Sequence, residues 1–209
     1  MTGQRTDLAA VAAQTLADYD AHANEFWDGT RDHDVRQNLD ALLGAIAGAP
    51  PHAILDLGCG PGRDLLALTE RGHVATGIDG AARFVEMARA YSGCDVWQQD
   101  FLALDLPAGR FDGVFANATL QHVPSAALPR VLLELHATLK PRGVLFASIP
   151  HGQGEEGWNR GRYCVYHAAL TWTRYVSEAG FTLLDQYYRP AGVPRERQPW
   201  LATVWRRTD

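Results

Sequence analysis

Three alternating glycines directly after an apolar segment are the residues of this chain best placed to do chemistry. Residues 53–57 are apolar except for Asp56, and Gly58, Gly60 and Gly62 follow them. Glycine reaches backbone angles that other residues avoid, and it lets a ligand approach the main chain closely. A helix predicted directly after the turn directs free N–H groups and a partial positive charge toward such a ligand. The pattern therefore predicts a strand, a ligand-binding turn and a helix.

Two common nucleotide-binding motifs with similar turns do not fit this segment. The dinucleotide fingerprint requires Gly-x-Gly-x-x-Gly, and Arg63 occupies the position of its third glycine. The chain also lacks the Gly-x-x-x-x-Gly-Lys-Ser/Thr of phosphate-loop nucleotide hydrolases. A tight strand-to-helix connection without a ligand is the alternative. Polar residues at the ends of later predicted strands favour a ligand.

Asp79 is the first of these polar residues. It ends the next predicted strand, about 20 residues past the glycine turn, where a carboxylate commonly accepts hydrogen bonds from both hydroxyls of a ribose. Gly80 and Ala81 open a helix, so a helix N-cap is the alternative role for Asp79. Asp100 with Phe101 and then Asn117 follow the third and fourth predicted strands. Ligands of parallel sheets lie beyond these strand ends.

The elements that position these residues alternate regularly from Ala53 onward. Strands are predicted at residues 53–57, 73–78, 95–98, 112–116, 144–149, 181–188 and 200–205. Helical patterns separate all but the last two, so we expect an α/β fold with a mostly parallel seven-stranded sheet and helices on both faces. The last two strands should pair antiparallel, because no helix joins them. Residues 150–166 are predicted as a glycine-rich loop.

The first fifty residues are predicted to be mostly helical. Residues 7–20 are alanine-rich, and a second helix has Val35, Leu39, Leu42, Leu43 and Ile46 on one face. The segment between these helices is polar and contains two aromatic residues, Phe26 and Trp27. We therefore expect a single domain over residues 1–209, with a helical cap at 1–50 and the sheet core at 51–209.

Composition excludes several classes of protein. A length of 209 residues, 46% hydrophobic and 21% charged residues are typical of a globular domain. The net charge of −5 and the absence of a basic run disfavour nucleic acid binding, and no apolar stretch approaches membrane-spanning length. Cys59, Cys94 and Cys164 show no Cys-x-x-Cys spacing, and Met1 to Asp7 has no signal-peptide character. We expect a cytoplasmic protein without disulfides, membrane contact or a metal site.

The Asp-x-Gly-x-Gly-x-Gly turn resembles motif I of class I S-adenosylmethionine (SAM) methyltransferases. The resemblance implies a Rossmann-like fold whose turn lies against the methionine part of SAM, with Asp79 at the ribose and Asp100 with Phe101 at the adenine. Tyr19, with Phe26 and Trp27, is expected to close over SAM from the N-terminal cap. The cofactor-binding residues implied in this way are Tyr19, Asp56, Gly58, Cys59, Gly60, Asp79, Gly80, Asp100, Phe101 and Asn117.

The resemblance also implies where the reaction takes place. Asn117 stands at the motif IV position, where the methyl group and the acceptor would meet, and its amide both donates and accepts hydrogen bonds. Many family members carry a histidine at the position of His122, although a structural histidine is an equal alternative. Tyr163 is the third residue predicted to be catalytic.

Later segments resemble the C-terminal methyltransferase domain of ovothiol synthases, which methylates the π nitrogen of 5-thiohistidine. The matching stretches are residues 30–35, the motif I segment, 84–101, 111–118, 128–145, 156–163, 187–190 and 198–201. Residues 119–121 and 150–154 depart from that pattern. The iron-dependent sulfoxide synthase domain of those enzymes is absent from these 209 residues. The resemblance therefore implies either a free-standing methyltransferase with a separate sulfoxide synthase as partner or a domain excised from a bifunctional enzyme.

An amino-acid substrate would bring a carboxylate, an ammonium group and a ring. Arginine suits the carboxylate through its bidentate fork, and the candidates are Arg31, Arg160 and Arg162, followed by Arg189. Glu155 or Glu156 would meet the ammonium. Tyr163, Tyr166 and His167 would contact the ring or fix its tautomer, and Trp158 would stack on it. Each charged candidate has an ordinary surface role as its alternative.

Three other functions remain open at this point. A SAM-dependent N- or O-methyltransferase of another small metabolite would share every cofactor residue. A non-catalytic SAM-binding protein is disfavoured by Gly58, Gly60, Asp79 and Asp100. A nucleic acid or protein methyltransferase is disfavoured by the acidic balance and by the absence of an Asn-Pro-Pro-Tyr-type motif after the fourth strand.

Overall fold

The computed structural model describes residues 7–208. The N-terminal segment Met1 to Asp7, which shows no signal-peptide character, therefore lies outside the described residues except for Asp7. Three helices come first: α1 (Leu8–Ala21), α2 (Ala23–Thr30) and α3 (Arg36–Ala45). The alternating part then runs β1 (Ala53–Leu57), α4 (Arg63–Glu70), β2 (Val74–Asp79), α5 (Ala82–Ser92), β3 (Asp95–Gln98), η1 (Phe101–Ala103), β4 (Phe111–Asn117), η2 (Leu120–His122), α6 (Leu128–Thr138) and β5 (Leu139–Pro150). The last elements are β6 (Glu155–Asn159), β7 (Arg162–Tyr166), α7 (Ala169–Glu178), β8 (Phe181–Arg189), η3 (Arg195–Arg197) and β9 (Trp200–Arg207).

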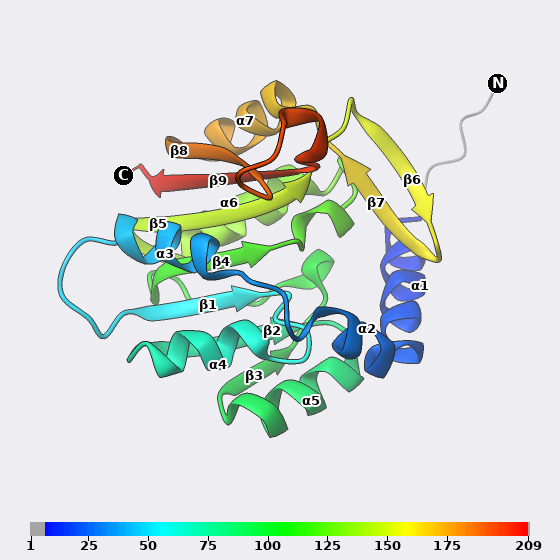
Figure 1. Ribbon diagram of the computed structural model, residues 1–209, viewed down its shortest axis with the longest axis horizontal. Helices are drawn as coiled ribbons and strands as arrows, with labels where there is room; N and C mark the ends of the chain where they lie inside the picture. Colours follow the sequence, from blue (N-terminus) through cyan, green and yellow to red (C-terminus); the bar gives the residue numbers. More distant parts are fainter. Residues whose placement is uncertain (1–6, 209) are drawn as a thin grey trace.

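The main sheet has seven strands in the order β3-β2-β1-β4-β5-β9-β8 (Figure 1). The strands from β3 to β5 pair in parallel, and β9 pairs antiparallel with both β5 and β8. The predicted α/β class, the seven-stranded sheet and the antiparallel last strand are therefore confirmed. Strand order reverses between β1 and β4, which places a ligand crevice at their carboxyl ends.

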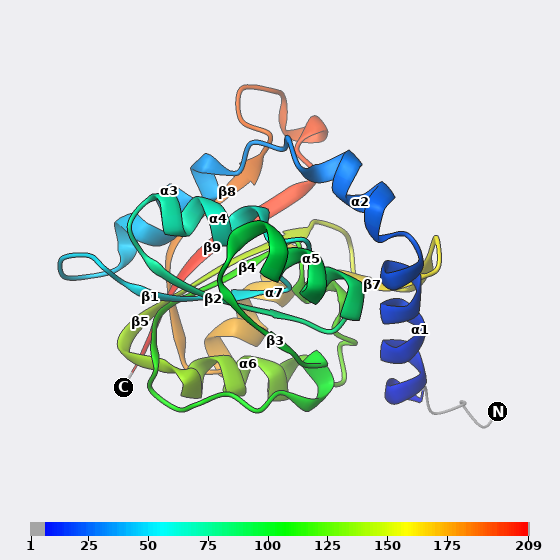
Figure 2. The same cartoon turned by 90° about the horizontal axis from the view of Figure 1, so that it is seen from below.

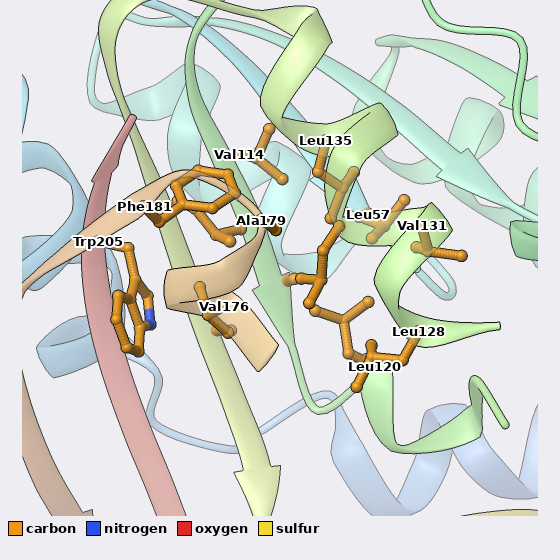
Figure 3. Packing of buried hydrophobic residues seen from close by; sticks show 14 of the residues in the cluster. Leu57, Val114, Leu120, Leu128, Val131, Leu135, Val176, Ala179, Phe181 and Trp205 are labelled. Atoms are coloured by element: carbon orange, nitrogen blue, oxygen red, sulfur yellow. The ribbon is translucent and has the colours of Figure 1, made fainter. Parts of the chain in front are cut away.

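Helices cover both faces of the sheet, as Figure 2 shows with α3, α4 and α5 on one side and α6 and α7 on the other. Adjacent residues of one strand serve the two layers: Val114 packs with α6 and α7, whereas Phe115 packs with the α3–α5 layer. This alternation is what a strand buried on both faces requires. Figure 3 shows the first layer, where Leu128, Val131 and Leu135 of α6 meet the strands.

Two segments differ from the prediction. Residues 150–166 were predicted as a loop, but β6 and β7 form an antiparallel hairpin there. Its turn has positive φ at Arg160 and Gly161, as a tight hairpin turn requires. The signal was missed because β6 is mostly exposed and carries no alternating pattern. Residues 23–30 were assigned to neither predicted helix, but they form α2, a short polar helix with one buried residue, Ala23.

The hairpin and α1 support each other beside the carboxyl ends of the strands (Figures 1 and 2). The backbone N–H of Tyr163 donates to the Thr15 hydroxyl at 3.0 Å, and Val11 packs against Tyr163 and Val165. The two segments are about 150 residues apart in the chain. A segment far along the chain thus helps to hold helix α1 in place, together with α5.

Candidate functional site

A cavity of about 570 Å³ lies at the carboxyl ends of the strands, below α1 and α2. Its lining divides by topology into two sides. The β1–β3 side contains Gly58, Cys59, Gly60, Asp79, Gly80, Phe84, Asp100 and Phe101, with Tyr19 and Phe26 from the helices. The β4–β8 side contains Asn117, Ser148, Arg189 and Trp200, with Asn38 from α3 and Asp64 from α4.

The glycine turn on the β1–β3 side is fixed to the neighbouring strand. The N–H groups of Gly58 and Cys59 both donate to the Ile78 carbonyl, at 2.7 and 3.0 Å. Gly58 has φ of +72°, and a Cβ there would lie 2.4 Å from the Thr119 hydroxyl oxygen. At Gly60, with φ of +52°, the nearest atom to an added Cβ is a Phe26 ring carbon at 3.7 Å. The main chain of the turn is therefore tightly packed against the protein at Gly58, and at Gly60 it is accessible from the cavity.

Asp79 links this turn to the next helix. One carboxylate oxygen accepts from the Gly60 N–H at 3.0 Å and the other from the Ala81 N–H at 2.9 Å. Burial raises its pKa to about 6, although these backbone hydrogen bonds act in the opposite direction. Each carboxylate oxygen has a second lone pair. Asp79 therefore serves the helix start and also offers acceptors to a ligand in the cavity.

Aromatic side chains from three helices cover the same side. Tyr19, Phe26 and Phe84 form a cluster with ring centroids 5.0 to 5.6 Å apart. Asp100 caps the short helix η1 by accepting from the Leu102 N–H at 2.9 Å, and Phe101 follows it into the cavity lining. The result is an apolar enclosure with carboxylates at two of its ends, which suits a nucleoside.

Asn117 is the centre of a polar network on the β4–β8 side. Its side-chain oxygen accepts from the Ser148 hydroxyl at 2.7 Å and from the Asn38 amide at 2.9 Å. The Ser148 oxygen itself accepts from the Ala118 N–H, so its proton is directed to Asn117. The amide nitrogen of Asn117 lies 3.4 Å from an Asp64 carboxylate oxygen. One amide N–H of Asn117 thus donates to Asp64, and the other N–H is left to offer to a ligand.

His122 connects the cavity to the hairpin. Its Nδ1 lies 2.8 Å from the Tyr163 carbonyl, and because a carbonyl only accepts, the ring donates from Nδ1. Nε2 then accepts from the Tyr19 hydroxyl at 2.8 Å. Burial lowers the pKa of His122 and raises that of Tyr19 to about 12. The neutral His122 therefore holds Tyr19 in place and also lines the cavity, so both of the roles given to it by the sequence remain predictions.

Several residues predicted to be catalytic or substrate-binding do not line the cavity. The Tyr163 hydroxyl donates to Glu156 at 3.1 Å, away from the site, and the Trp158 ring packs against Tyr163 on the exposed hairpin. Arg160 is exposed at the hairpin turn. His167 is buried beside Trp172 and Tyr175. We expected residues 150–166 to be a loop that could fold over the site, but the β6–β7 hairpin fixes these side chains away from the cavity.

Three further predicted residues are also outside the cavity lining. Arg162 donates to Asp18 at 2.6 Å, and its guanidinium lies 3.9 Å from the centre of the Tyr19 ring. Arg31 pairs with Asp28 and Asp32 on the exposed end of α2. Asp56 is buried beneath the glycine turn, where burial and then the Asp64 carboxylate raise its pKa. Arg162 and Asp56 therefore support the site from outside, and Arg31 is a surface charge.

The cavity also contains polar residues that sequence reasoning missed. Asn38 lies on the helix predicted from its apolar face, and Asp64 is in the first turn of α4, paired with Arg63 at 2.7 Å. Ser148 lies in β5 and Trp200 in β9, two strands that were predicted only as parts of the buried sheet and not as parts of a site. The one available signal is register, since Asn117 pairs with Ser148 at the ends of β4 and β5.

Comparison with known proteins identifies the domain. Residues 54–143 match the family described as a methyltransferase domain. The chain superposes over its full length on 94% of the Burkholderia thailandensis 1,6-didemethyltoxoflavin-N1-methyltransferase, whose structure holds 1,6-didemethyltoxoflavin and S-adenosylhomocysteine, with a TM-score of 0.81 and 25% identity. Residues 54–143 form a class I SAM-dependent methyltransferase domain. The predicted methyltransferase domain is thereby confirmed for these residues.

Curated relatives share this methyltransferase domain. A trans-aconitate 2-methyltransferase of Azoarcus sp. is 38% identical over 116 residues, which are 54% of this chain and 45% of the relative. A ubiquinone biosynthesis O-methyltransferase of Pseudomonas aeruginosa is 31% identical over 152 residues, which are 68% of this chain and 64% of the relative. The chain spans about half to two thirds of the length of these relatives.

The residues of the methyltransferase domain fit SAM. The open face of Gly60 admits a ligand against the main chain, and the buried Asp79 carboxylate has lone pairs beyond its two backbone donors. The aromatic cluster encloses the space between Asp79 and Asp100. Within residues 7–208, no cluster of histidine, cysteine or acidic residues could hold a metal ion. Over the same range, no helix is long and apolar enough to cross a membrane.

Proposed function

We propose that this protein transfers the methyl group of SAM to a ring nitrogen of a small metabolite, with the π nitrogen of 5-thiohistidine as the first candidate. The observation that carries the proposal is the network around Asn117. Its members are two amides, a hydroxyl and a carboxylate already paired with Arg63. Amides and a hydroxyl are not bases and the carboxylate is engaged by Arg63, so this network suits an acceptor that offers its lone pair without being deprotonated first.

A neutral imidazole meets this condition, because one of its nitrogens has a free lone pair. When bound, SAM supplies a sulfonium methyl group for in-line transfer, in which the sulfur keeps the electron pair of the broken carbon–sulfur bond. The residues of the chain contribute alignment: Asp79, Gly60 and the aromatic cluster would hold the donor, and Asn117 would orient the acceptor. The side chains around Asn117 would also exclude water from the reacting atoms.

One structural neighbour and the sequence resemblance support nitrogen as the acceptor atom. The structural neighbour that aligns over the full chain is named as an N1-methyltransferase and contains a ring-nitrogen substrate. The stretches that resemble ovothiol synthase methyltransferase domains include Tyr187, which donates to Asn38 in the Asn117 network at 3.0 Å. Methylation of an oxygen is the second candidate, since the curated relatives include an O-methyltransferase and a trans-aconitate methyltransferase.

The proposed function also assigns roles to the residues of the site. Gly58, Cys59, Gly60, Asp79, Gly80, Asp100 and Phe101 would hold SAM, with Tyr19 above them. Asn117 would be the catalytic residue. A separate sulfoxide synthase that supplies thiohistidine is part of the same proposal.

Mass spectrometry of turnover with SAM tests the proposal. The substrates are 5-thiohistidine, histidine and a panel of small amines, phenols and carboxylic acids, and NMR locates the added methyl group. A product methylated on the π nitrogen of thiohistidine is the expected result. Methylation of an oxygen in another panel member would overturn the nitrogen assignment and leave the methyltransferase domain intact.

A further inference from the structure

Arg189 is the one arginine on the β4–β8 side of the cavity, and it differs from the other arginines near the site. Its Nη2 donates to the Asp34 main-chain carbonyl at 2.9 Å, and its Nε is buried without a hydrogen-bond partner. No ion pair joins it to a carboxylate within residues 7–208. A buried N–H of a charged group without a partner is costly, so it favours a ligand acceptor.

The other candidate arginines are already engaged. Arg63, which also lines the cavity, pairs with Asp64, and Arg162 pairs with Asp18. Arg31 pairs with Asp28 and Asp32 at the surface. The neighbouring Asp34 carboxylate does not neutralise Arg189 alone, because Arg36 holds both of its oxygens, at 3.0 and 2.8 Å.

Strand register places Arg189 on the face of the sheet that carries Asn117. Asn117 pairs with Ser148, which pairs with Ala202, which pairs with Tyr187. Paired residues share a face, and so do residues two apart in one strand. Arg189 and its partner Trp200 therefore continue the Asn117 row one step farther toward the strand ends.

The same register separates Arg189 from the cofactor. Arg189 stands on β8, three strands from Asn117, which is about 14 Å between strand axes at a spacing of about 4.8 Å. The glycine turn and Asp79 lie on the opposite side of β4. A ligand group at Arg189 is therefore a part of the methyl acceptor rather than the carboxylate of SAM.

We propose that Arg189 binds a carboxylate of the methyl acceptor, so that the substrate is a small anionic metabolite held between Arg189 and Asn117. This inference rests on the proposed function, because it assigns the β4–β8 side to the acceptor. The Nε–H and the second N–H of Nη2 lie on the same side of the guanidinium and match a carboxylate in a bidentate pair. Trp200, directly opposite Arg189 across the strand pair, supplies an apolar surface beside that pair.

The test is calorimetric binding to protein saturated with S-adenosylhomocysteine. The probes are matched pairs with and without a carboxylate: 5-thiohistidine with its decarboxylated amine, and trans-aconitate with its trimethyl ester. We expect one carboxylate probe to bind about 10- to 100-fold more tightly than its partner, as a charge-assisted hydrogen-bonded pair would give. Arg189→Gln should abolish this preference, and Arg189→Lys should restore part of it.

Arg195→Gln is the matched control. Arg195 lies in the connection that follows Arg189, stacks over Tyr188 and does not line the cavity, so its loss should leave the preference unchanged. Three results would overturn the inference: no carboxylate preference in either pair, an unchanged preference in Arg189→Gln, or a matching loss of S-adenosylhomocysteine affinity in that variant.

The outcome is separable from that of the proposed function. A carboxylate preference that depends on Arg189, without turnover of any probe, supports the anchor and contradicts methyl transfer to these metabolites. Turnover of a probe that lacks a carboxylate, at the rate of its carboxylated partner, supports methyl transfer and overturns the anchor.

Discussion

The two sides of the cavity are built in different ways. The β1–β3 side takes Gly58, Gly60, Asp79 and Asp100 from three successive strand ends and their turns. The β4–β8 side joins Asn38, Asn117, Ser148 and Arg189 from four elements spread over most of the chain. A site assembled from consecutive βα units can be read along the sequence, whereas a site assembled across the sheet depends on strand order.

The two sides also differ in charge. Asp79 and Asp100 are carboxylates with their main hydrogen bonds to backbone N–H groups, which suits a ligand that brings hydroxyl and amine donors. The opposite side carries an arginine and an amide that presents an N–H group, which suits a ligand that brings acceptors. The difference predicts that variants on one side change donor binding and variants on the other change acceptor binding.

The largest expected effect is on the β1–β3 side. Asp79→Ala removes the acceptor of the Gly60 and Ala81 N–H groups and the proposed ribose contacts, so S-adenosylhomocysteine affinity should fall about 100-fold or more, by calorimetry. Asp105→Ala, an exposed carboxylate in the loop after η1, is the control and should bind normally. Affinity like that of the parent chain in Asp79→Ala would remove the ribose assignment.

Asn117→Ala tests the other side. It leaves Asn38 and Ser148 without their shared acceptor and removes the N–H group offered to the acceptor, so kcat should fall about 10- to 100-fold. S-adenosylhomocysteine affinity should change far less. The control is Asn159→Ala, whose amide contacts only the Tyr166 hydroxyl on the hairpin. Full turnover in Asn117→Ala would show that this amide is not at the reaction centre.

The pH dependence separates binding from stability at one residue. The pKa of Asp79 is raised to about 6, so the carboxylate is ionised at pH 7 and becomes protonated as the pH falls through 6. S-adenosylhomocysteine affinity should therefore weaken about 10-fold between pH 7 and pH 5, because a protonated carboxyl accepts less well. Asp79→Asn should bind weakly with no such dependence.

Stability should respond to the same group in the opposite sense. A carboxyl whose folded pKa lies above its unfolded value stabilises the fold at low pH, and this contribution is lost as the pH rises through about 6. The difference in unfolding free energy between Asp79→Asn and the parent chain should therefore shift between pH 4 and pH 7 in urea titrations. A constant difference over that range would contradict the raised pKa.

The smallest expected effect concerns the support of the cap. Arg162→Gln removes the ion pair with Asp18 and the contact with the Tyr19 ring, so α1 should open more often. We expect a loss of about 3- to 10-fold in S-adenosylhomocysteine affinity, together with faster hydrogen exchange in residues 8–21. Arg160→Gln at the exposed turn of the same hairpin should change neither. An unchanged exchange rate in Arg162→Gln would show that the hairpin does not hold α1.

Prediction from sequence succeeded where the signal was local. Burial and helix spacing placed the strands around the glycine turn, so Gly58, Gly60, Asp79, Asp100 and Asn117 all line the cavity as expected. It failed at β6 and β7, whose short exposed strands resemble a loop, and with them for Tyr163, Trp158 and His167. Arg31, Arg160 and Arg162 were the first candidates for a substrate carboxylate, but the structure pairs Arg162 with Asp18, and Arg31 with Asp28 and Asp32.

By itself, the sequence determined the class of the protein. Backbone sterics and burial within a few residues set the first strand, the turn with glycines at 58 and 60, and the acidic residue at the end of the next strand. Together these features define the donor side of a SAM-dependent methyltransferase domain. The tertiary structure decided the acceptor side. Only strand order and register bring Asn117, Ser148 and Arg189 onto one face, and only the packing of the whole chain shows which charges are already paired and which remain for a substrate.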